Sequence, residues 1–278
     1  MTQMTLSAIL LVIGALAYLT SGILIVRALR RPEGRAPAGL RTLALAGFVL
    51  HCAGVAAEMF FGDLIHFGFG MAVSAMLLIA VAITLTESYV HRLNALTGTV
   101  LIIAAAGSVL PVVFPGTTYP TEAWSMLFRV HLLAALAAYS FMTIAVVQAI
   151  FLMRMDHALK NPLKALETPA NAGLLSNMPN LMAMERILFR IITCGFVCLT
   201  LVLILGALAT MQSHGVPFVW DHKTLLTWMS WIVFAVLLIG RYGFGWRKTK
   251  ALGWFWAGIF VLGSGRKHTF GDGFVYGF

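Results

Sequence analysis

Short polar breaks divide the chain into long runs of apolar residues. Most runs contain about 20 residues, the length that an α-helix needs to cross the hydrocarbon core of a bilayer. Breaks such as Arg31-Pro32, Gly62-Asp63 and Gly215-Val216-Pro217 separate them. Because hydrocarbon cannot satisfy an open backbone, each run is predicted to form a helix. We expect about eight transmembrane helices, at residues 5–26, 42–60, 64–83, 93–113, 125–152, 187–211, 224–240 and 251–263.

The last of these runs is shorter than the others. It ends near Gly263, which makes it shorter than the roughly 17 residues of a minimal transmembrane helix. Arg266 and Lys267 follow it. A crossing segment would place these two basic residues outside, whereas a re-entrant segment would keep them inside. Whether this segment crosses the membrane stays open.

Composition agrees with the pattern of runs. Hydrophobic residues make up 60% of the chain, charged residues only 10%, and the mean hydropathy is +0.91. A soluble domain carries about 25% charged residues, because its surface faces water. The sequence therefore predicts an all-α, polytopic integral membrane helix bundle, forming a single transmembrane domain over residues 1–278.

The distribution of positive charge predicts the orientation. Most of the 19 lysines and arginines lie in the first, third, fifth and seventh loops. Such loops are cytoplasmic by the positive-inside rule, so the N-terminus is predicted to lie outside. The longest cytoplasmic loop is then 154–186, and the location is the bacterial inner (plasma) membrane. The basic residues are dispersed among the apolar runs, which excludes a nucleic-acid-binding face.

Ionisable side chains within the apolar runs are costly and mark candidate functional positions. His51 lies in the middle of the second predicted helix, and Glu58, seven residues later, shares its face, with Asp63 beyond. These three residues would suit a transporter or channel with a polar path. In the predicted topology, several histidines lie at or near the outer face: His66, His131, His214, His222 and His268. Imidazoles gathered on one side indicate a metal, haem or proton-handling site.

His131 lies near the start of the fifth predicted helix. Trp124 precedes it by seven residues, so indole and imidazole are expected on one face. The following residues 134–138 are mostly alanine. Such small residues allow a second helix or a flat macrocycle to approach closely. A hydrogen-bonded histidine between helices is the alternative interpretation.

The segment before the seventh predicted helix holds a second candidate group, Trp220, Asp221, His222 and Lys223. Asp221 suits a helix N-cap, and Trp220 suits the interfacial aromatic belt. Together with His131, however, the segment would place two outer-face histidines near aromatic rings. A haem iron binds two axial imidazoles from opposite sides. Arg129 and Lys223 are the basic residues of this face and would suit haem propionates.

Three stretches resemble the cytochrome c assembly, or haem-handling, family of membrane proteins. The resemblance is to the CcsA and CcmC type, and in particular to the YpjD-like or HemX-like branch. Residues 124–141 (WSMLFRVHLLAALAAYSF) are similar to the family's histidine helix. Residues 220–234 (WDHKTLLTWMSWIVF) are similar to its Trp-Asp-x-Lys segment, and Gly245-Trp246-Arg247-Lys248 to its Gly-Trp-Arg segment. The resemblance covers about half of the chain, from Trp124 onward.

The resemblance implies a non-covalent, b-type haem near the outer face and a role in cytochrome c assembly. In the YpjD-like branch a histidine stands directly before Lys-Thr, as His222 does, so the implied axial ligands are His131 and His222. Trp124, Trp220, Asp221, Arg129 and Lys223 complete the implied haem-binding set. The chain departs from the family at the tryptophan-rich outer loop, of which only Trp220-Asp221 remains. His268 is a poor counterpart of the family's second outer histidine.

We expect a binding or assembly factor rather than an enzyme, because the sequence shows no nucleophile–base pair and no phosphate loop. It also lacks Cys-x-x-Cys-His, the attachment site of a c-type haem. The expected partners are the lipid bilayer and other cytochrome c assembly proteins or another membrane protein. The alternative is a haem-free accessory or regulatory subunit on the same fold, which binds another membrane protein through the fifth loop.

Overall fold

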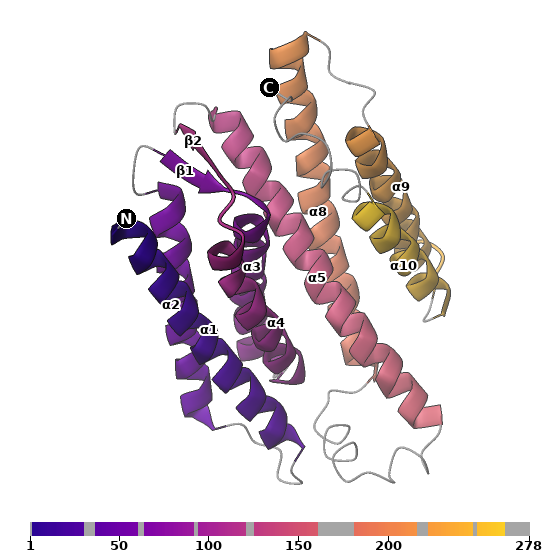
Figure 1. Cartoon of the computed structure of the whole chain (residues 1–278). Coiled ribbons are helices and arrows are strands. Elements are labelled where there is room, and N and C mark those ends of the chain that lie inside the picture. The colour runs from indigo at the N-terminus through magenta and orange to yellow at the C-terminus, as the bar shows by residue number, and fades with distance from the viewer. Residues whose placement is uncertain are drawn as a thin grey trace. The chain divides into compact units, whose positions relative to one another are not determined.

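The computed structural model describes residues 2–30, 37–60, 64–91, 94–120, 125–160, 181–215, 222–246 and 249–264 (Figure 1). Helices account for nearly all of them. They are α1 (Thr2–Leu29), α2 (Ala38–Phe60), α3 (Phe69–His91), α4 (Asn94–Val113), α5 (Met126–Lys160), α8 (Leu181–His214), α9 (His222–Tyr242) and α10 (Thr249–Ser264). The two short strands are β1 (Leu64–Phe67) and β2 (Thr117–Pro120).

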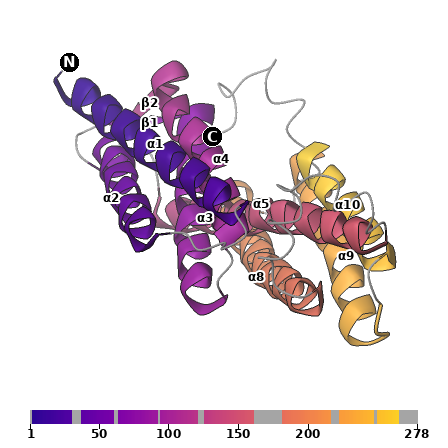
Figure 2. The same cartoon turned by 90° about the horizontal axis from the view of Figure 1, so that it is seen from below.

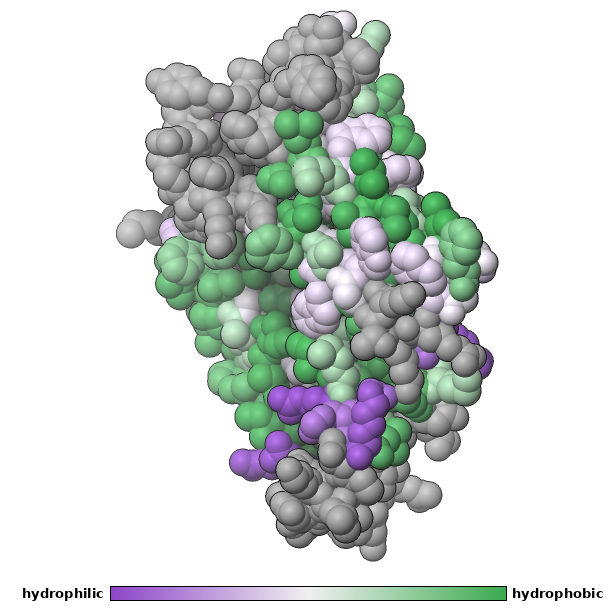
Figure 3. All heavy atoms as spheres, turned by 90° about the vertical axis from the view of Figure 1, so that its right-hand side faces the viewer, coloured by the Kyte–Doolittle hydropathy of each residue, from purple (hydrophilic) through white to green (hydrophobic). Residues whose placement is uncertain are grey.

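The helices have the dimensions of membrane spans. Within the described part of the chain, 7 helices are long and apolar enough to cross a bilayer, and the apolar part of α10, Ala251–Gly263, is shorter. On the face seen in Figure 3, apolar side chains predominate and strongly hydrophilic ones gather towards one end. The predicted fold class, an all-α polytopic membrane bundle, is confirmed. A crossing by α10 stays a prediction.

The chain packs as two compact units. Unit 1 comprises Met1–Ser125 and Tyr139–Ile191, and unit 2 comprises Met126–Ala138 and Ile192–Phe278. Helices α5 and α8 contribute one part to each unit. The expectation of a single transmembrane domain stays a prediction.

In unit 1, α1 packs lengthwise and antiparallel against α2, side by side in Figures 1 and 2. Glycines on both helices allow this close approach. A Cβ atom at Gly14, for example, would lie only 3.2 Å from the carbonyl oxygen of Gly47. Four residue pairs meet along the contact: Ser7 with Glu58, Leu11 with Gly54, Gly14 with His51, and Tyr18 with Gly47. The contact therefore carries His51 and Glu58 on one stripe of α2, as their seven-residue spacing predicts.

Helix α1 also crosses α4 closely in unit 1. A Cβ atom at Gly22 would lie 2.8 Å from the carbonyl oxygen of Gly98, and one at Gly98 would lie 2.9 Å from Val26 Cγ2. The two backbones approach so closely only because neither glycine carries a side chain. This crossing fixes the relative position of α1 and α4.

The two strands form an antiparallel ribbon at one end of unit 1, here called the ribbon end. In its register, Leu64 is paired with Pro120 and Phe67 with Thr117. The predicted third helix was therefore wrong over its first residues, since it was placed from Leu64 and α3 begins only at Phe69. Backbone pairing with a segment 50 residues away replaces the first helical turn. Gly116, at φ 74°, supplies the left-handed residue before β2 that an L side chain would strain.

The ends of the predicted fifth loop are helical. Helix α5 continues to Lys160, whose ammonium lies 2.6 Å from Asp156 one turn earlier. Helix α8 begins at Leu181, and the remainder of the predicted loop, 161–180, lies outside the described residues. In unit 1, Arg190 of α8 pairs with Glu87 of α3. The Lys160–Asp156 pair supports the last turn of α5, because side chains at i and i+4 neighbour each other, and the Arg190–Glu87 pair joins α8 to α3.

In unit 2, α9 packs against α10. The ring of Phe234 lies edge-on to that of Phe255 at 6.4 Å, and both side chains are buried. A Cβ atom at Gly258 would lie 2.9 Å from the Phe234 ring, so this glycine makes room for the ring. Aromatic burial thus holds the short α10 in place.

Candidate functional site

His131 lies on α5, in its unit 2 part, and faces α8. A Cβ atom at Gly206 would lie 3.3 Å from His131 Cε1 and 3.7 Å from its Nδ1. The Nδ1 atom is buried and has no hydrogen-bond partner among the described residues. His131 therefore has one ring nitrogen without a partner, held against a glycine.

Two side-chain contacts show the direction in which α9 runs along α8. Trp231 Nε1 donates to Thr200 Oγ1 at 2.9 Å, and the Thr193 and Tyr242 hydroxyls lie 3.2 Å apart. Later residues of α9 thus meet earlier residues of α8, so the two helices run antiparallel. His222 precedes Trp231 by nine residues and Tyr242 by 20, so the two contacts extrapolate it to Ala209 and to Ser213 of α8, respectively.

The same contacts relate the two predicted ligands to each other. His131 contacts α8 at Gly206, and His222 is extrapolated to a position three to seven residues further along. Three to seven residues correspond to about 4.5–10.5 Å along a helix axis. The backbones of the two histidines therefore lie toward the same end of α8, on two helices that both contact it.

An aromatic cluster lies deeper in unit 2. Phe196 stacks on Trp231 with ring centroids 5.4 Å apart, and Trp228 meets Trp231 edge-on at 6.1 Å. The hydrogen bond to Thr200 satisfies the indole nitrogen of Trp231, as a partly buried indole requires. Sequence reasoning missed Phe196, Thr200 and Gly206. The available signal was Gly206, because a glycine inside an apolar run indicates a packing or functional reason.

The structure describes only part of the remaining predicted set. Arg129 is exposed and lies two positions before His131, and side chains two apart on a helix do not face each other. His222 and Lys223 are the first two residues of α9. The structure describes their backbone but not their side chains. Trp124, Trp220 and Asp221 lie outside the described residues. The structure thus brings His131 and the start of α9 toward the same end of α8 and places Arg129 on another side of α5.

The described residues fit one half of a bis-imidazole haem site. A histidine ligand needs a ring nitrogen that is not committed to a protein partner, and the buried Nδ1 shows that His131 has one. Gly206 presents no side chain to the imidazole, and the alanines 134, 135, 137 and 138 follow along α5. The His131 imidazole therefore stands beside a glycine of α8 and is followed along α5 by several alanines.

The described histidines of unit 1 are held differently. His51 is fully buried, its Nε2 lies 2.8 Å from the Ser74 hydroxyl, and Tyr18 lies edge-on to its ring. Gly14 packs directly against its backbone, and its Nδ1, like that of His131, has no hydrogen-bond partner among the described residues. His66 Nδ1 lies 3.4 Å from Glu58 Oε2 at the ribbon end. Between Glu58 and His51, Leu11 packs on Gly54, so apolar contact separates the polar groups of the predicted path; its third member, Asp63, lies outside the described residues.

The Gly-Trp segment after α9 forms a turn. Gly245 takes the left-handed conformation at φ 64°, and Arg241 Nη1 donates to the Trp246 carbonyl at 3.0 Å. The Trp246 indole lies over Gly240, where a Cβ atom would come within 2.4 Å of it, and stacks on Trp254 of α10. Gly240, Gly245 and Trp246 therefore have a structural role, because their contacts connect α9 to α10.

Comparison with known proteins gives a family. The model of the family "Cytochrome C assembly protein" matches residues 39–263. Inner membrane protein YpjD of Escherichia coli (strain K12) is 32% identical over 133 residues, which are 48% of this chain and 47% of that protein. Cytochrome c biogenesis protein CcsA of Cyanophora paradoxa is 30% identical over 125 residues, 41% of this chain and 38% of that protein. CcsA of Picosynechococcus sp. (strain ATCC 27264 / PCC 7002 / PR-6) is 33% identical over 114 residues, 37% and 33%.

These alignments span about half or less of the length of the curated relatives. No solved structure matches significantly. The family match nevertheless covers most of the chain, from the start of α2 to the end of the apolar part of α10, and the apolar helices agree with it. The chain therefore belongs to the cytochrome c assembly protein family, on the YpjD-like branch, and is a multi-pass inner-membrane protein.

Proposed function

We propose that this chain takes part in cytochrome c biogenesis by holding a non-covalent, b-type haem near the outer face of the membrane. His131 and His222 are the two axial ligands in this proposal. One observation supports it: the contacts of α8 with α9 and with His131 indicate that both histidines lie toward the C-terminal end of α8. Family membership supports the same chemistry, since CcsA relatives are named for cytochrome c biogenesis.

Each residue has a distinct task in the proposal. A bound haem would supply an iron that takes two axial nitrogen ligands. His131 offers an imidazole with one ring nitrogen that has no partner, and Gly206 keeps side-chain bulk away from that imidazole. The Trp231–Thr200 hydrogen bond holds α9, and therefore the start of that helix at His222, in register. These contacts pre-organise the ligands, as a cofactor site requires.

The remaining predicted residues complete the site. Lys223 is adjacent to His222 in sequence, and a charge-assisted hydrogen bond to a propionate suits it. Arg129 lies on another side of α5 from His131, so its long side chain would have to reach a propionate from there. Trp124 and Trp220 offer rings for stacking, and Asp221, which directly precedes the first residue of α9 in sequence, is of a type that suits a helix N-cap. The proposed partners are the lipid bilayer and other proteins of cytochrome c assembly.

The test is the visible spectrum of the protein purified in mild detergent, oxidised and reduced. Wild type is compared with His131→Ala, His222→Ala and the control His157→Ala, whose exposed side chain lies at the other end of α5. We expect a Soret band with sharp low-spin bands on reduction in wild type and in the control. Both ligand variants should lose most of this signal. Added imidazole should restore it in His131→Gly, which a purely structural role for His131 would not produce.

Other outcomes would redirect the proposal. Haem retained by both ligand variants would keep the function and move the ligands to other histidines, such as His66, His214 or His268. A colourless wild type that also fails to take up added haem would contradict the proposal. That result would favour the haem-free accessory subunit, for which substitution of His131 and His222 should leave the function intact.

A further inference from the structure

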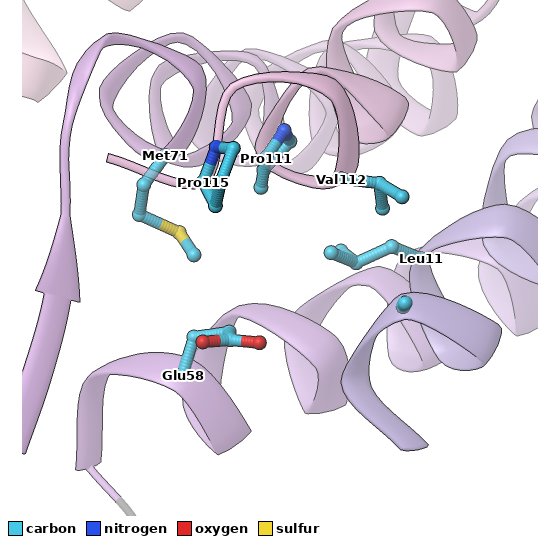
Figure 4. Close-up of a pocket in the computed structure, with 7 residues that line it drawn as sticks. Leu11, Glu58, Met71, Pro111, Val112 and Pro115 are labelled. Carbon is cyan, nitrogen blue, oxygen red and sulfur yellow. The ribbon is translucent and has the colours of Figure 1, made fainter. Parts of the chain in front are cut away.

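Unit 1 contains a cavity of about 190 Å³ at its ribbon end. Four helices line it, and six of the seven lining residues are apolar or proline: Ala8, Leu11, Met71, Pro111, Val112 and Pro115. The seventh is Glu58 of α2. In Figure 4 the Glu58 carboxylate lies on one side of the cavity and faces Met71, Pro111 and Pro115 on the other. The cavity is thus an apolar chamber with one carboxylate in its wall.

The two carboxylate oxygens of Glu58 have separate protein contacts. The Ser7 hydroxyl of α1 donates a hydrogen bond to Oε1. His66 of β1 lies with Nδ1 3.4 Å from Oε2 and acts as a counter-charge only when it is protonated. The Glu58 side chain is 14% exposed, so water screens its charge only weakly. A neutral hydroxyl and an imidazole therefore support a carboxylate that is mostly removed from water.

No permanently charged basic residue stands near Glu58 in sequence. Lysine and arginine are absent from 42–91 and from 93–128, and Arg27 and Arg41 lie at the opposite ends of α1 and α2. Burying a carboxylate without a counter-charge is costly. The wall of the cavity consequently favours an occupant that brings positive charge and hydrogen-bond donors to Glu58.

The lining discriminates between classes of ligand. Ca²⁺ takes six to eight oxygen ligands, and no group of three or more His, Cys, Asp or Glu side chains within the described ranges is placed to hold a metal ion. An anion would be repelled by the carboxylate. A purely apolar occupant would leave the carboxylate desolvated without compensation. A primary ammonium group has three N–H donors for the carboxylate, and a short alkyl chain suits the apolar walls.

We infer that this cavity binds the primary ammonium group of a small amphiphile, with Glu58 as its counter-charge. Its volume of about 190 Å³ is enough for an ammonium group with a few carbon atoms. The group has two natural sources, the headgroup of an aminophospholipid at the membrane surface and a free alkylamine. The site is in unit 1 and is independent of the proposed haem ligands.

The first test is binding of n-butylammonium to the full chain in maltoside detergent, followed by ligand-detected NMR. Wild type should bind it saturably, and Glu58→Gln, which keeps the size of the side chain, should weaken binding by at least about tenfold. The matched control is Glu87→Gln, the same substitution at the other end of unit 1, where Glu87 pairs with Arg190. It should leave binding unchanged. The isosteric neutral probe n-butanol should bind wild type at least about tenfold more weakly than n-butylammonium.

The second test distinguishes the sources of the ammonium group. Native mass spectrometry counts phosphatidylethanolamine retained by wild type and by Glu58→Gln after extraction from vesicles that contain phosphatidylethanolamine and phosphatidylcholine. Preferential retention by wild type identifies the lipid headgroup. Equal retention, together with n-butylammonium binding to wild type, identifies a free amine. Either result supports an ammonium site.

Two results would overturn the inference. One is equal n-butylammonium affinity in wild type and Glu58→Gln, and the other is wild type that shows neither saturable binding nor lipid preference. If Glu58→Gln fails to fold, Val112→Phe replaces it, because this half-exposed side chain lines the cavity without touching the carboxylate contacts. Loss of binding in Val112→Phe supports the inference, and unchanged binding refutes it. None of these readouts depends on haem.

Discussion

Trp231 of α9 and Thr200 of α8 are joined by a hydrogen bond of 2.9 Å from the indole Nε1 to the hydroxyl Oγ1. Phe196 stacks on the same indole, one turn before Thr200 along α8. The Trp231–Thr200 hydrogen bond has a preferred direction, whereas the stacking of Phe196 on Trp231 tolerates sliding. The Thr200 hydroxyl therefore sets the position of the Trp231 indole along α8. The depth of His222 at the start of α9 follows from that position.

Thr200→Val should therefore destabilise unit 2. The substitution keeps the shape of the side chain but leaves a partly buried indole N–H without an acceptor, at a cost of about 1–3 kcal/mol. Thermal unfolding in detergent, followed by tryptophan fluorescence, measures the loss. The control is Thr20→Val, because the exposed Thr20 hydroxyl bonds to the Leu16 carbonyl of its own helix. Equal unfolding temperatures for Thr200→Val and Thr20→Val would contradict the role of this bond.

Gly206→Val should weaken haem binding if His131 is a ligand. The new side chain would begin 3.3 Å from His131 Cε1 and force the ring to move. Overpacking of this kind costs about 1–3 kcal/mol, or roughly tenfold in affinity. Haem titration followed in the Soret region measures the affinity. Gly253→Val on α10 is the control, since nothing lies within 4 Å of its Cβ position; a similar loss in both variants would speak against the His131–Gly206 contact.

Ser74→Ala should destabilise unit 1 without removing haem. The Ser74 hydroxyl contacts Nε2 of the buried His51, whose Nδ1 has no other partner among the described residues. Its loss should lower the free energy of unfolding by about 1–3 kcal/mol, measured by thermal unfolding. Ser230→Ala, which removes a buried hydroxyl bonded within its own helix, should cost less. Loss of the Soret band in folded Ser74→Ala would instead place His51 at the haem site.

Gly22→Ala and Gly39→Ala should have effects of opposite sign. At Gly22 the new methyl group would meet the Gly98 carbonyl at 2.8 Å, so the α1–α4 crossing must open, at a cost of about 1–3 kcal/mol. At Gly39 nothing lies within 4 Å, and alanine is the better helix former by up to about 1 kcal/mol. Chemical denaturation in mixed micelles measures both changes. Stabilisation by both variants would show that the crossing is looser than described.

The predicted orientation can be tested with an impermeant thiol reagent on intact cells. Cys52, Cys194 and Cys198 are first replaced by alanine to remove background. A cysteine introduced at the exposed Thr118 of β2 should be labelled from outside, and one at the exposed Arg30 after α1 only once the cells are opened. The expectation follows from the basic residues around Arg30. The reverse labelling pattern would place the N-terminus inside.

Much of the fold was predictable because the bilayer constrains it so strongly. A run of about 20 apolar residues has few stable structures other than a helix, so run lengths predicted where the helices lie. The prediction failed at Leu64–Phe67, where apolar residues form a strand with β2. Hydropathy does not separate a short apolar strand from a helical turn. The strand forms because a partner segment lies beside it, and that neighbour is set by the packing of α1 to α4.

The sequence by itself determined the membrane class, the approximate helices, the family and the helix face that His51 and Glu58 share. Only the tertiary structure decided which residues meet across helices: His131 with Gly206, Trp231 with Thr200, and Ser7 with Glu58. The reason is physical. Periodicity along one helix determines the direction of a side chain, but the position of two helices along each other depends on the shapes of both surfaces, where a glycine or a hydroxyl on one helix selects its partner on the other.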